Sequence, residues 1–313
     1  MTTSNPLPEK LNQFFSQEQT EARRIFHGRG HCYTGYEHIC IDWFPPVVLI
    51  SAWQPVEDID TITSLILESA PAGHLKAIVL QHRYIDQSPA ETLYGEIPKK
   101  VIVKAQGLRF EVRPGKQQNV GLFLDTGPLR EWLKLNSSDC NVLNLFAYTC
   151  ALSVAAMAGG AKSVTNVDMS KPSIEWGNQN HMLNGQGPMP IKRIPHNIFK
   201  SWGRIKQFGR YDLVIIDPPS QQRGSFNAEK NYKSIVRRMK ELCNPGATII
   251  AALNSPFLSR QFLLDVFEKE LPQATFEEWM PVADEFEEVD TEKGLKIARF
   301  SLHFTPREAE NNE

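Results

Sequence analysis

The sequence predicts an α/β protein whose larger part is a doubly wound, mostly parallel sheet, preceded by a small N-terminal α/β domain. Two observations carry this prediction. From residue 126 onward, short apolar segments typical of buried strands alternate with segments of helical periodicity. The last two apolar segments have no helix between them, so we expect them to pair as an antiparallel hairpin at the end of the sheet.

The first domain is expected to span residues 1–97. Apolar residues at helical spacing run from Pro8 to Phe26 and predict the first helix, and a loop rich in Gly, His and Tyr follows it. The polar stretch 86–100 is the best candidate for a linker or an exposed loop. The other elements expected here are strands over Ile39–Phe44, Val47–Trp53 and Leu75–His82 and a helix over Asp60–Ser69.

A connector is expected over residues 98–125. The segments Lys100–Ala105 and Leu108–Arg113 flank Gln106-Gly107 and predict a β-hairpin. The segment 120–125, VGLFLD, is a short apolar run and predicts one more strand. The second domain then spans residues 126–313.

The strands and helices of the second domain alternate along the chain. Ser170 is a plausible N-cap of one of the helices. The predicted strands are Asn141–Phe146, Ser163–Val167, Tyr211–Ile216, Ala247–Leu253, Thr275–Val282 and Leu295–Phe304. The predicted helices are Leu129–Leu135, Leu152–Ala158, Pro172–Leu183, Asn231–Leu242 and Pro256–Glu270.

Composition limits the class of protein. Of the 313 residues 41% are hydrophobic and 22% charged, which is typical of a globular chain. A net charge of −2 excludes a uniformly basic nucleic-acid coat. The five cysteines form no CxxC pair, so we expect reduced thiols and no metal site. The chain has no signal-peptide pattern and no apolar run long enough for a membrane span, so the expected location is the cytoplasm.

A carboxylate is expected at the end of the second parallel strand. Asp168 lies 24 residues after Asn144, where it can accept hydrogen bonds from the hydroxyls of an adenosine ribose. Sites for NAD and for S-adenosylmethionine (SAM) share this demand, and a helix-capping Asp is the simpler alternative. The first strand is followed by Phe146 and Tyr148 and not by the GxGxxG pattern that a pyrophosphate needs. A SAM site is therefore favoured over a dinucleotide site.

The sequence Asp217-Pro218-Pro219-Ser220 follows another predicted strand. Two prolines make a stiff, extended turn that can aim the Asp217 carboxylate and the Pro218 carbonyl at one point. Two acceptors on a rigid frame suit the amine of a nucleobase. The alternative is a pair of prolines that only ends the strand.

These motifs carry a resemblance to a known family. The stretches GLFLDTGPLREWL (121–133), NLFAYTC to HMLNG (144–185) and YDLVIIDPPS (211–220) resemble class I SAM-dependent methyltransferases. More narrowly, residues 95–255 resemble the bacterial 23S ribosomal RNA large-subunit methyltransferases of the K/L type, in their guanine-N7 half, and of the I type. The resemblance implies a seven-stranded Rossmann-like sheet, SAM as cofactor and 23S rRNA or a ribosomal assembly particle as partner.

The resemblance also implies roles for particular residues. Asp217, Pro218, Pro219 and Ser220 would form the catalytic motif. The implied cofactor contacts are Asp125, Arg130, Asn144, Phe146, Tyr148, Asp168, Met169, Asn197, Ile198 and Asp217.

Three departures from the family pattern bear on function. Cys150 stands where the family has glycine, and Asn197 replaces the acidic residue that contacts the adenine amine, although the Asn197 oxygen could still accept that hydrogen bond. Methylation at cytosine C5 needs a cysteine nucleophile, but Asn254 and Ser255 occupy the matching stretch. We therefore expect methylation of a base nitrogen.

The near-zero net charge conceals an uneven distribution. Residues 192–240 hold 12 Lys and Arg against 3 Asp and Glu, whereas residues 268–313 hold 5 against 13. Phe226 and Tyr232 could stack on a target base, although both are more typical of a core. The predicted RNA-binding residues are Arg223, Lys230, Lys233, Arg237 and Arg238, with an ordinary solvated helix face as the alternative.

The sequence thus predicts a SAM-dependent methyltransferase that acts on a base nitrogen of ribosomal RNA. Two alternatives stay open: a methyltransferase for a protein or small molecule, and a non-catalytic RNA-binding module with a degenerate SAM pocket. A nucleotide dehydrogenase is disfavoured because the glycine motif is absent.

Overall fold

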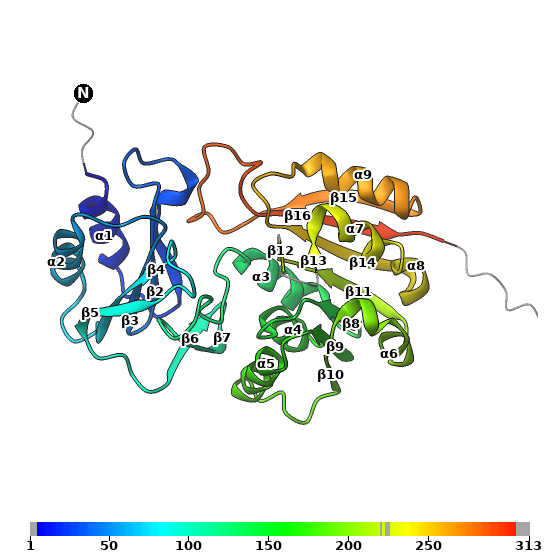
Figure 1. The fold of residues 1–313 in the computed structure, drawn as a ribbon. Coiled ribbons are helices and arrows are strands. Elements are labelled where there is room, and N and C mark those ends of the chain that lie inside the picture. The colour runs from blue at the N-terminus through cyan, green and yellow to red at the C-terminus, as the bar shows by residue number, and fades with distance from the viewer. Residues whose placement is uncertain (1–4, 220, 223–225, 305–313) are drawn as a thin grey trace, which may run out of the picture. The chain divides into compact units, whose positions relative to one another are not determined.

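The computed structural model describes residues 5–219, 221–222 and 226–304, and the chain packs into two compact units (Figure 1). The N-terminal unit holds the chain through Gly127 together with Ala283–Thr291. The C-terminal unit holds Pro128–Val282 and the chain from Glu292 onward. The chain therefore passes between the units three times.

The N-terminal unit is built on a five-stranded sheet in the order β1-β2-β3-β4-β5, with β3 and β4 as the parallel pair. Helices α1 and α2 pack against each other, and their apolar side chains join those of the sheet in one core. The elements are α1 Leu7–Phe15, β1 Arg23–His27, the 3₁₀ turn η1 Gly28–Gly30, β2 Ile39–Phe44, β3 Val47–Ala52, α2 Ile59–Ser69, β4 Ala77–His82, β5 Ala90–Gly95, β6 Val101–Ala105 and β7 Leu108–Val112.

The predicted hairpin around Gln106-Gly107 is confirmed. Strands β6 and β7 pair in antiparallel register from Val101 opposite Val112 to Ala105 opposite Leu108. Gln106 and Gly107 both have positive φ, 49° and 74°, as a two-residue hairpin turn requires.

Three predictions for this part of the chain are wrong. The first helix ends at Phe15 and does not extend to Phe26. Ile25 and Phe26 belong to strand β1 and are buried there. A bulge in the pairing of β1 with β2 gives their apolar side chains a spacing that resembles a helix. The proposed linker contains β5, whose polar composition reflects an exposed edge strand. Residues 120–125 form no strand: Leu122 and Leu124 are buried alternately, but the segment joins no ladder of the described sheets.

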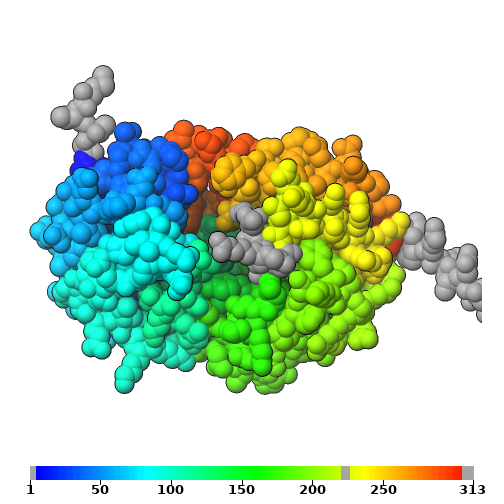
Figure 2. All heavy atoms as spheres, viewed as in Figure 1, coloured from blue at the N-terminus to red at the C-terminus, as the bar shows by residue number. Residues whose placement is uncertain are grey.

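Residues 283–291 form a strap that packs on the N-terminal unit, although the strands on either side of it belong to the C-terminal sheet. Its acidic side chains meet basic ones: Glu287 pairs with Lys10, and Glu288 pairs with His27 at 3.3 Å. The Arg24 guanidinium lies 4.2 Å from the centre of the Phe286 ring. Figure 2 shows the orange-red surface of the strap beside the blue surface of the early chain.

The C-terminal unit confirms the predicted fold class. Its seven strands follow the order β10-β9-β8-β11-β14-β16-β15, in which the first five are parallel and the last two form the antiparallel C-terminal hairpin. The strands are β8 Asn141–Leu145, β9 Ser163–Asp168, β10 Ile191–Pro195, β11 Tyr211–Ile216, β14 Cys243–Leu253, β15 Ala274–Met280 and β16 Lys296–Leu302, and the short pair β12 Gln221–Gln222 and β13 Phe226–Asn227 lies apart from this sheet.

Helices cover both faces of this sheet (Figure 1). Helices α4 and α5 pack on β8 and β9, while α6 to α9 contribute to the large apolar core with β11 and β14. The helices are α3 Gly127–Asn136, α4 Ala151–Ala158, α5 Lys171–Leu183, α6 Trp202–Gln207, α7 Ala228–Val236, α8 Met239–Leu242 and α9 Arg260–Glu270, with the 3₁₀ turn η2 at Ile198–Lys200.

The strand order reverses at the centre of the sheet. From β8 the chain builds β9 and β10 on one side, then returns to add β11 and β14 on the other. Ligands of such sheets bind beyond the carboxyl ends of the strands at this switch point.

Among the described residues, no helix is long and apolar enough to cross a membrane.

Candidate cofactor-binding site

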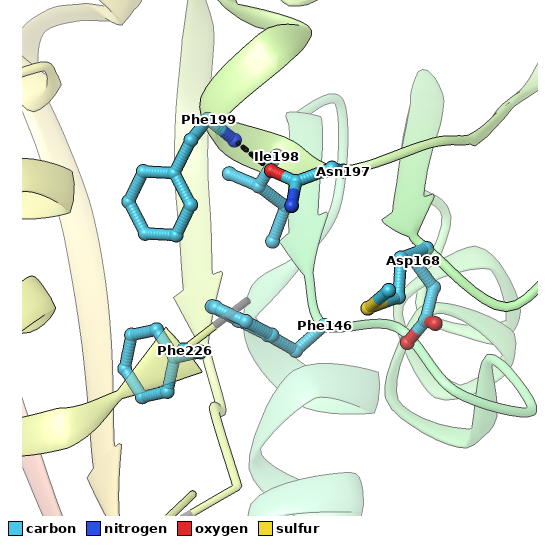
Figure 3. Close-up of a pocket in the computed structure, with 7 residues that line it drawn as sticks. Phe146, Asp168, Asn197, Ile198, Phe199 and Phe226 are labelled. Atoms are coloured by element: carbon cyan, nitrogen blue, oxygen red, sulfur yellow. Dashed lines mark hydrogen bonds between the residues drawn. The ribbon is translucent and has the colours of Figure 1, made fainter. Parts of the chain in front are cut away.

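A pocket of about 260 Å³ opens at the carboxyl ends of β8, β9 and β10 (Figure 3). This volume includes space open to solvent, so the pocket is an open cleft and not a closed cavity. Its walls contain five of the residues predicted from the sequence. The lining residues are Phe146, Asp168, Met169, Asn197, Ile198, Phe199 and Phe226.

The loop after β8 has an unusual backbone. Phe146, Tyr148 and Cys150 all have positive φ, at 59°, 45° and 62°, which residues with a Cβ rarely adopt. Strained conformations of this kind cluster at ligand sites, where the surrounding structure holds them. Here the Tyr148 N–H donates to Asp168 Oδ2 at 2.9 Å, and the Tyr148 ring packs edge-on against Trp176.

Asp168 lies at the end of β9 and is held by two backbone donors. Its Oδ2 accepts from Tyr148 N and its Oδ1 accepts from Ser170 N at 2.8 Å. Burial raises the pKa of Asp168, and the two backbone hydrogen bonds oppose that rise. Each carboxylate oxygen has a further lone pair, so the group can still accept from two vicinal hydroxyls. Ser170 caps α5, as predicted.

Asn197 presents its amide nitrogen to the pocket. Its Oδ1 accepts from the Phe199 N–H at 2.9 Å and caps η2. Because only the amide oxygen can accept this hydrogen bond, the other terminal atom of the side chain is the nitrogen. Figure 3 shows the Nδ2 group turned toward the open space between Asn197 and Phe146. The oxygen that the sequence suggested for an adenine amine is thus engaged with the backbone, and the exposed group is a donor.

Aromatic rings form one wall of the pocket. The centres of the Phe146 and Phe226 rings are 5.0 Å apart, and Phe199 stacks on Phe226 at 6.4 Å. An apolar wall opposite a few polar groups suits a flat purine ring. Phe199 was missed in the sequence, although it follows the predicted Ile198 directly.

Asp217 follows β11, the strand next to β8, and therefore lies on the same edge of the sheet as the pocket. Pro218 is buried and Pro219 is exposed, while Ser220 lies outside the described residues. Burial and the nearby charge of Asp217 raise the pKa of Tyr232 well above its ordinary value. Asp217 does not line the pocket; it follows the strand that pairs with β8.

Comparison with known proteins shows the family to which the chain belongs. Residues 23–301 match the model of the S-adenosylmethionine-dependent methyltransferase family. The chain belongs to this family. Among curated relatives, it is similar to the ribosomal RNA large subunit methyltransferase K/L of Hahella chejuensis, with 29% identity over 82% of this chain and 36% of the relative. The same enzyme of Psychrobacter sp. is 33% identical over 57% of this chain and 23% of its own length.

Solved structures share the fold. A protein from Streptococcus mutans is 23% identical and has a TM-score of 0.81, covering 95% of this chain and 81% of its own. The SAM-dependent methyltransferase from Agrobacterium tumefaciens is 21% identical with a TM-score of 0.66, covering 84% of this chain and 87% of its own. This methyltransferase chain spans about a third of the length of the Hahella relative.

The pocket of this methyltransferase fits SAM, its family's cofactor. Asp168 would accept hydrogen bonds from the ribose, and Phe146, Ile198 and Phe199 would form an apolar slot for adenine. Met169, 43% exposed, forms a further part of the wall. When bound, SAM supplies a methyl group on a sulfonium, which is an excellent leaving group.

Five of the ten predicted cofactor residues do not line the pocket: Tyr148 and Asp217, described above, and Asn144, Arg130 and Asp125. Asn144 is buried in β8 and donates from Nδ2 to Asn166 Oδ1 of β9 at 3.1 Å, a contact that ties two strands. Arg130 in α3 is fully buried. Asp125 belongs to the N-terminal unit, where its carbonyl accepts from the Ala283 N–H.

The predicted RNA-binding residues differ in their surroundings. Lys230 and Lys233 are exposed on α7, and Arg223 lies outside the described residues. Arg237 is paired with Glu270, and Arg238 is paired with Glu241. A second basic stretch, from β10 through α6, contains no Asp or Glu between residues 187 and 211. Its exposed side chains are Lys192, Arg193, Lys200, Arg204, Lys206 and Arg210.

Two aromatic residues considered for base stacking belong to packed regions. Tyr232 is fully buried, and its hydroxyl donates to the Ala252 carbonyl at 3.0 Å. Phe226 is 3% exposed and lies in the pocket wall.

Among the described residues, no group of three His, Cys, Asp or Glu side chains could hold a metal ion.

Proposed function

We propose that this methyltransferase transfers a methyl group to a base nitrogen of ribosomal RNA. The observation that carries the proposal is the position of Asp217-Pro218-Pro219, which follows β11 on the sheet edge that also holds the SAM pocket. A carboxylate and a carbonyl on a rigid turn can hold a base amine or the edge of a base ring beside the sulfonium.

The chemical task of the protein is alignment. Asp168 and Asn197 orient the nucleoside end of the cofactor, while Asp217 and the Pro218 carbonyl position the acceptor base. A ring nitrogen attacks with its own lone pair, so no proton has to be removed first. An exocyclic amine loses one proton after the new N–C bond forms, and Asp217 could accept it.

The cysteines of the C-terminal unit argue against methylation at carbon. Cys150 and Cys243 are 1% and 0% exposed, and burial raises the pKa of each to about 12. Neither thiol is therefore ionised or accessible near neutral pH, as covalent addition to a pyrimidine ring requires. Cys140 lies just before β8, at the opposite edge of the sheet from the pocket.

RNA is supported as the substrate by charge and by the relatives. The basic residues from Lys192 to Arg210 flank Asn197, Ile198 and Phe199, which line the pocket. Phosphates beside the target base would meet positive charge there, and also at Lys230 and Lys233 of α7. Curated relatives are named as ribosomal RNA large subunit methyltransferases. We accordingly place the protein in the cytoplasm, acting on 23S rRNA or an assembly particle.

Labelled-methyl transfer from SAM tests this proposal. Ribosomal RNA from cells lacking the protein should gain label with the wild type, and digestion should place that label on a base nitrogen. Asp217→Asn should lose about 10²-fold or more of the rate, while thermal stabilisation by S-adenosylhomocysteine stays as in the wild type. Label on a base carbon, or in protein only, would contradict the proposal.

A further inference from the structure

We propose that Phe257 is the platform on which the target base stacks during methyl transfer; this inference rests on the RNA-methylating function proposed above. Phe257 is 93% exposed, more than any other large apolar side chain among the described residues. Every base has a π face, so an exposed aromatic ring binds bases whatever their sequence.

Phe257 lies on the edge of the sheet where the reaction would occur. It follows β14, which pairs in parallel with β11, the strand that ends at Asp217. Ile216 is opposite Ala251, so the two strands end within two residues of each other. Adjacent strands are about 4.8 Å apart. The order from the cofactor pocket is therefore β8, then β11 with Asp217, then β14 with Phe257.

The loop that carries Phe257 is anchored, although its ring is exposed. The Phe257 N–H donates to Ser255 Oγ at 3.3 Å, and Ser255 is 5% exposed. Lys296 of β16 is 1% exposed, and its ammonium donates to the Ser255 carbonyl at 2.9 Å. The same ammonium donates to the carbonyls of Glu292 and Gly294. A buried cation with three carbonyl partners holds its neighbours in a defined position, so the ring is presented on a fixed base.

The residues considered earlier cannot supply this platform. Tyr232 lies in the core, and Phe226 packs between Phe146 and Phe199. The proline motif carries no aromatic residue at position 220, where Ser stands. A ring in solvent contributes little to the folding free energy, and a base held at the end of β11 would give it a stacking partner on the same sheet edge.

Substitutions at 257 test the proposal with bulk ribosomal RNA as the probe. Phe257→Ala should lower kcat/KM for the RNA by about 5- to 150-fold. Phe257→Trp should stay within about threefold of the wild type. Phe257→Leu, which keeps an apolar side chain but has no π face, should resemble Phe257→Ala. Leu135→Ala is the matched control, because Leu135 is 82% exposed near the end of α3, before β8 begins.

The outcomes separate the two proposals. Melting temperature and stabilisation by S-adenosylhomocysteine should be unchanged in every variant, since Phe257 packs on nothing that the fold needs. If the wild type transfers no label to RNA, the proposed function is wrong, and the stacking role of Phe257 is then wrong as well. If the wild type labels RNA and Phe257→Ala does so equally, only the stacking role is wrong. Equal losses in Phe257→Trp and Phe257→Ala, or a changed oligomeric state in Phe257→Ala, would also overturn it.

Discussion

Gly177 of α5 packs directly against Cys150 in the loop after β8. A Cβ atom at Gly177 would lie 2.3 Å from Cys150 Sγ and 2.8 Å from Cys150 Cβ. The thiol therefore fills the space that the missing side chain leaves. Cys150 adopts left-handed backbone angles, φ 62° and ψ 21°, where glycine would be unstrained. The departure from the family's glycine at 150 is thus accommodated by a glycine on the facing helix.

We predict strong coupling between these two positions. Gly177→Ala should destabilise the fold by about 1–3 kcal/mol, because its methyl group overlaps the Cys150 side chain. In a Cys150→Gly background the same change should cost much less, because the thiol is gone and alanine favours a helix, and only the 3.0 Å approach to the Thr149 backbone carbon remains. Urea denaturation of both single variants and the double variant gives the coupling free energy, expected to be at least about 1 kcal/mol. Additive effects would show that the two side chains do not compete for one space.

Asn197→Asp should tighten binding of S-adenosylhomocysteine by several-fold, on the order of 1 kcal/mol. Asp also caps a helix, so the hydrogen bond from Phe199 N to Oδ1 is kept. The change converts the pocket-facing donor into an acceptor, which suits the adenine amine. Isothermal titration calorimetry measures the affinity, with Asn197→Ala as the variant that loses both contacts. Weaker binding by Asn197→Asp would mean that Asn197 donates to a ring nitrogen instead.

The centre of the parallel sheet was predictable because β11 and the second half of β14 are apolar at nearly every position. Strand β10 was not predicted, because it lies at the sheet edge and carries the exposed Lys192 and Arg193. β11 carries its apolar run to Ile216, and Asp217 marks its end, so the boundary was predicted to the residue. The carboxylate at the end of β9 was predictable for the same reason, since Asp168 follows the apolar Val167 directly.

Other features depend on contacts that no local pattern contains. The strand β1 was taken for helix because its bulge places Ile25 and Phe26 on the buried side together. The donor character of Asn197 follows from a cap whose partner is the Phe199 backbone. Phe257 was not predicted as a functional residue because the apolar pattern placed it inside a helix that begins at Pro256. In the structure α9 begins at Arg260, so Phe257 lies in the loop before the helix.

Stability should fall as the pH drops from about 6.5 to about 4 because of His181. This side chain is 1% exposed between Ser153 and Gln186, and burial lowers its pKa to about 4. Between these pH values the unfolded chain binds a proton that the folded chain does not, so unfolding is favoured by up to about 3 kcal/mol. Below pH 4 both states are protonated and the loss levels off.

Denaturation curves at several pH values test the role of His181. His181→Gln should be less stable at pH 7.5 but should show a flatter pH dependence between 6.5 and 4 than the wild type. The exposed His74→Gln is the matched control and should follow the wild-type profile. An unchanged slope in His181→Gln would assign the acid sensitivity to other groups.

Gly30→Ala should displace the strap 283–291 from the N-terminal unit. A Cβ at Gly30 would lie 1.8 Å from the Glu287 carbonyl oxygen, and backbone cannot yield as a flexible side chain does. The displacement would break the hydrogen bond from Val289 N to the Gly30 carbonyl and the pairs of Glu287 with Lys10 and Glu288 with His27. We expect faster proteolytic cleavage within 283–291 and a decrease of about 1–3 kcal/mol in the free energy of unfolding.

Gly203→Ala, where an added Cβ meets nothing within 4 Å, is the control and should be neutral or stabilising. A strap that stays protected in Gly30→Ala would show that its hold on this unit does not depend on the close approach at Gly30.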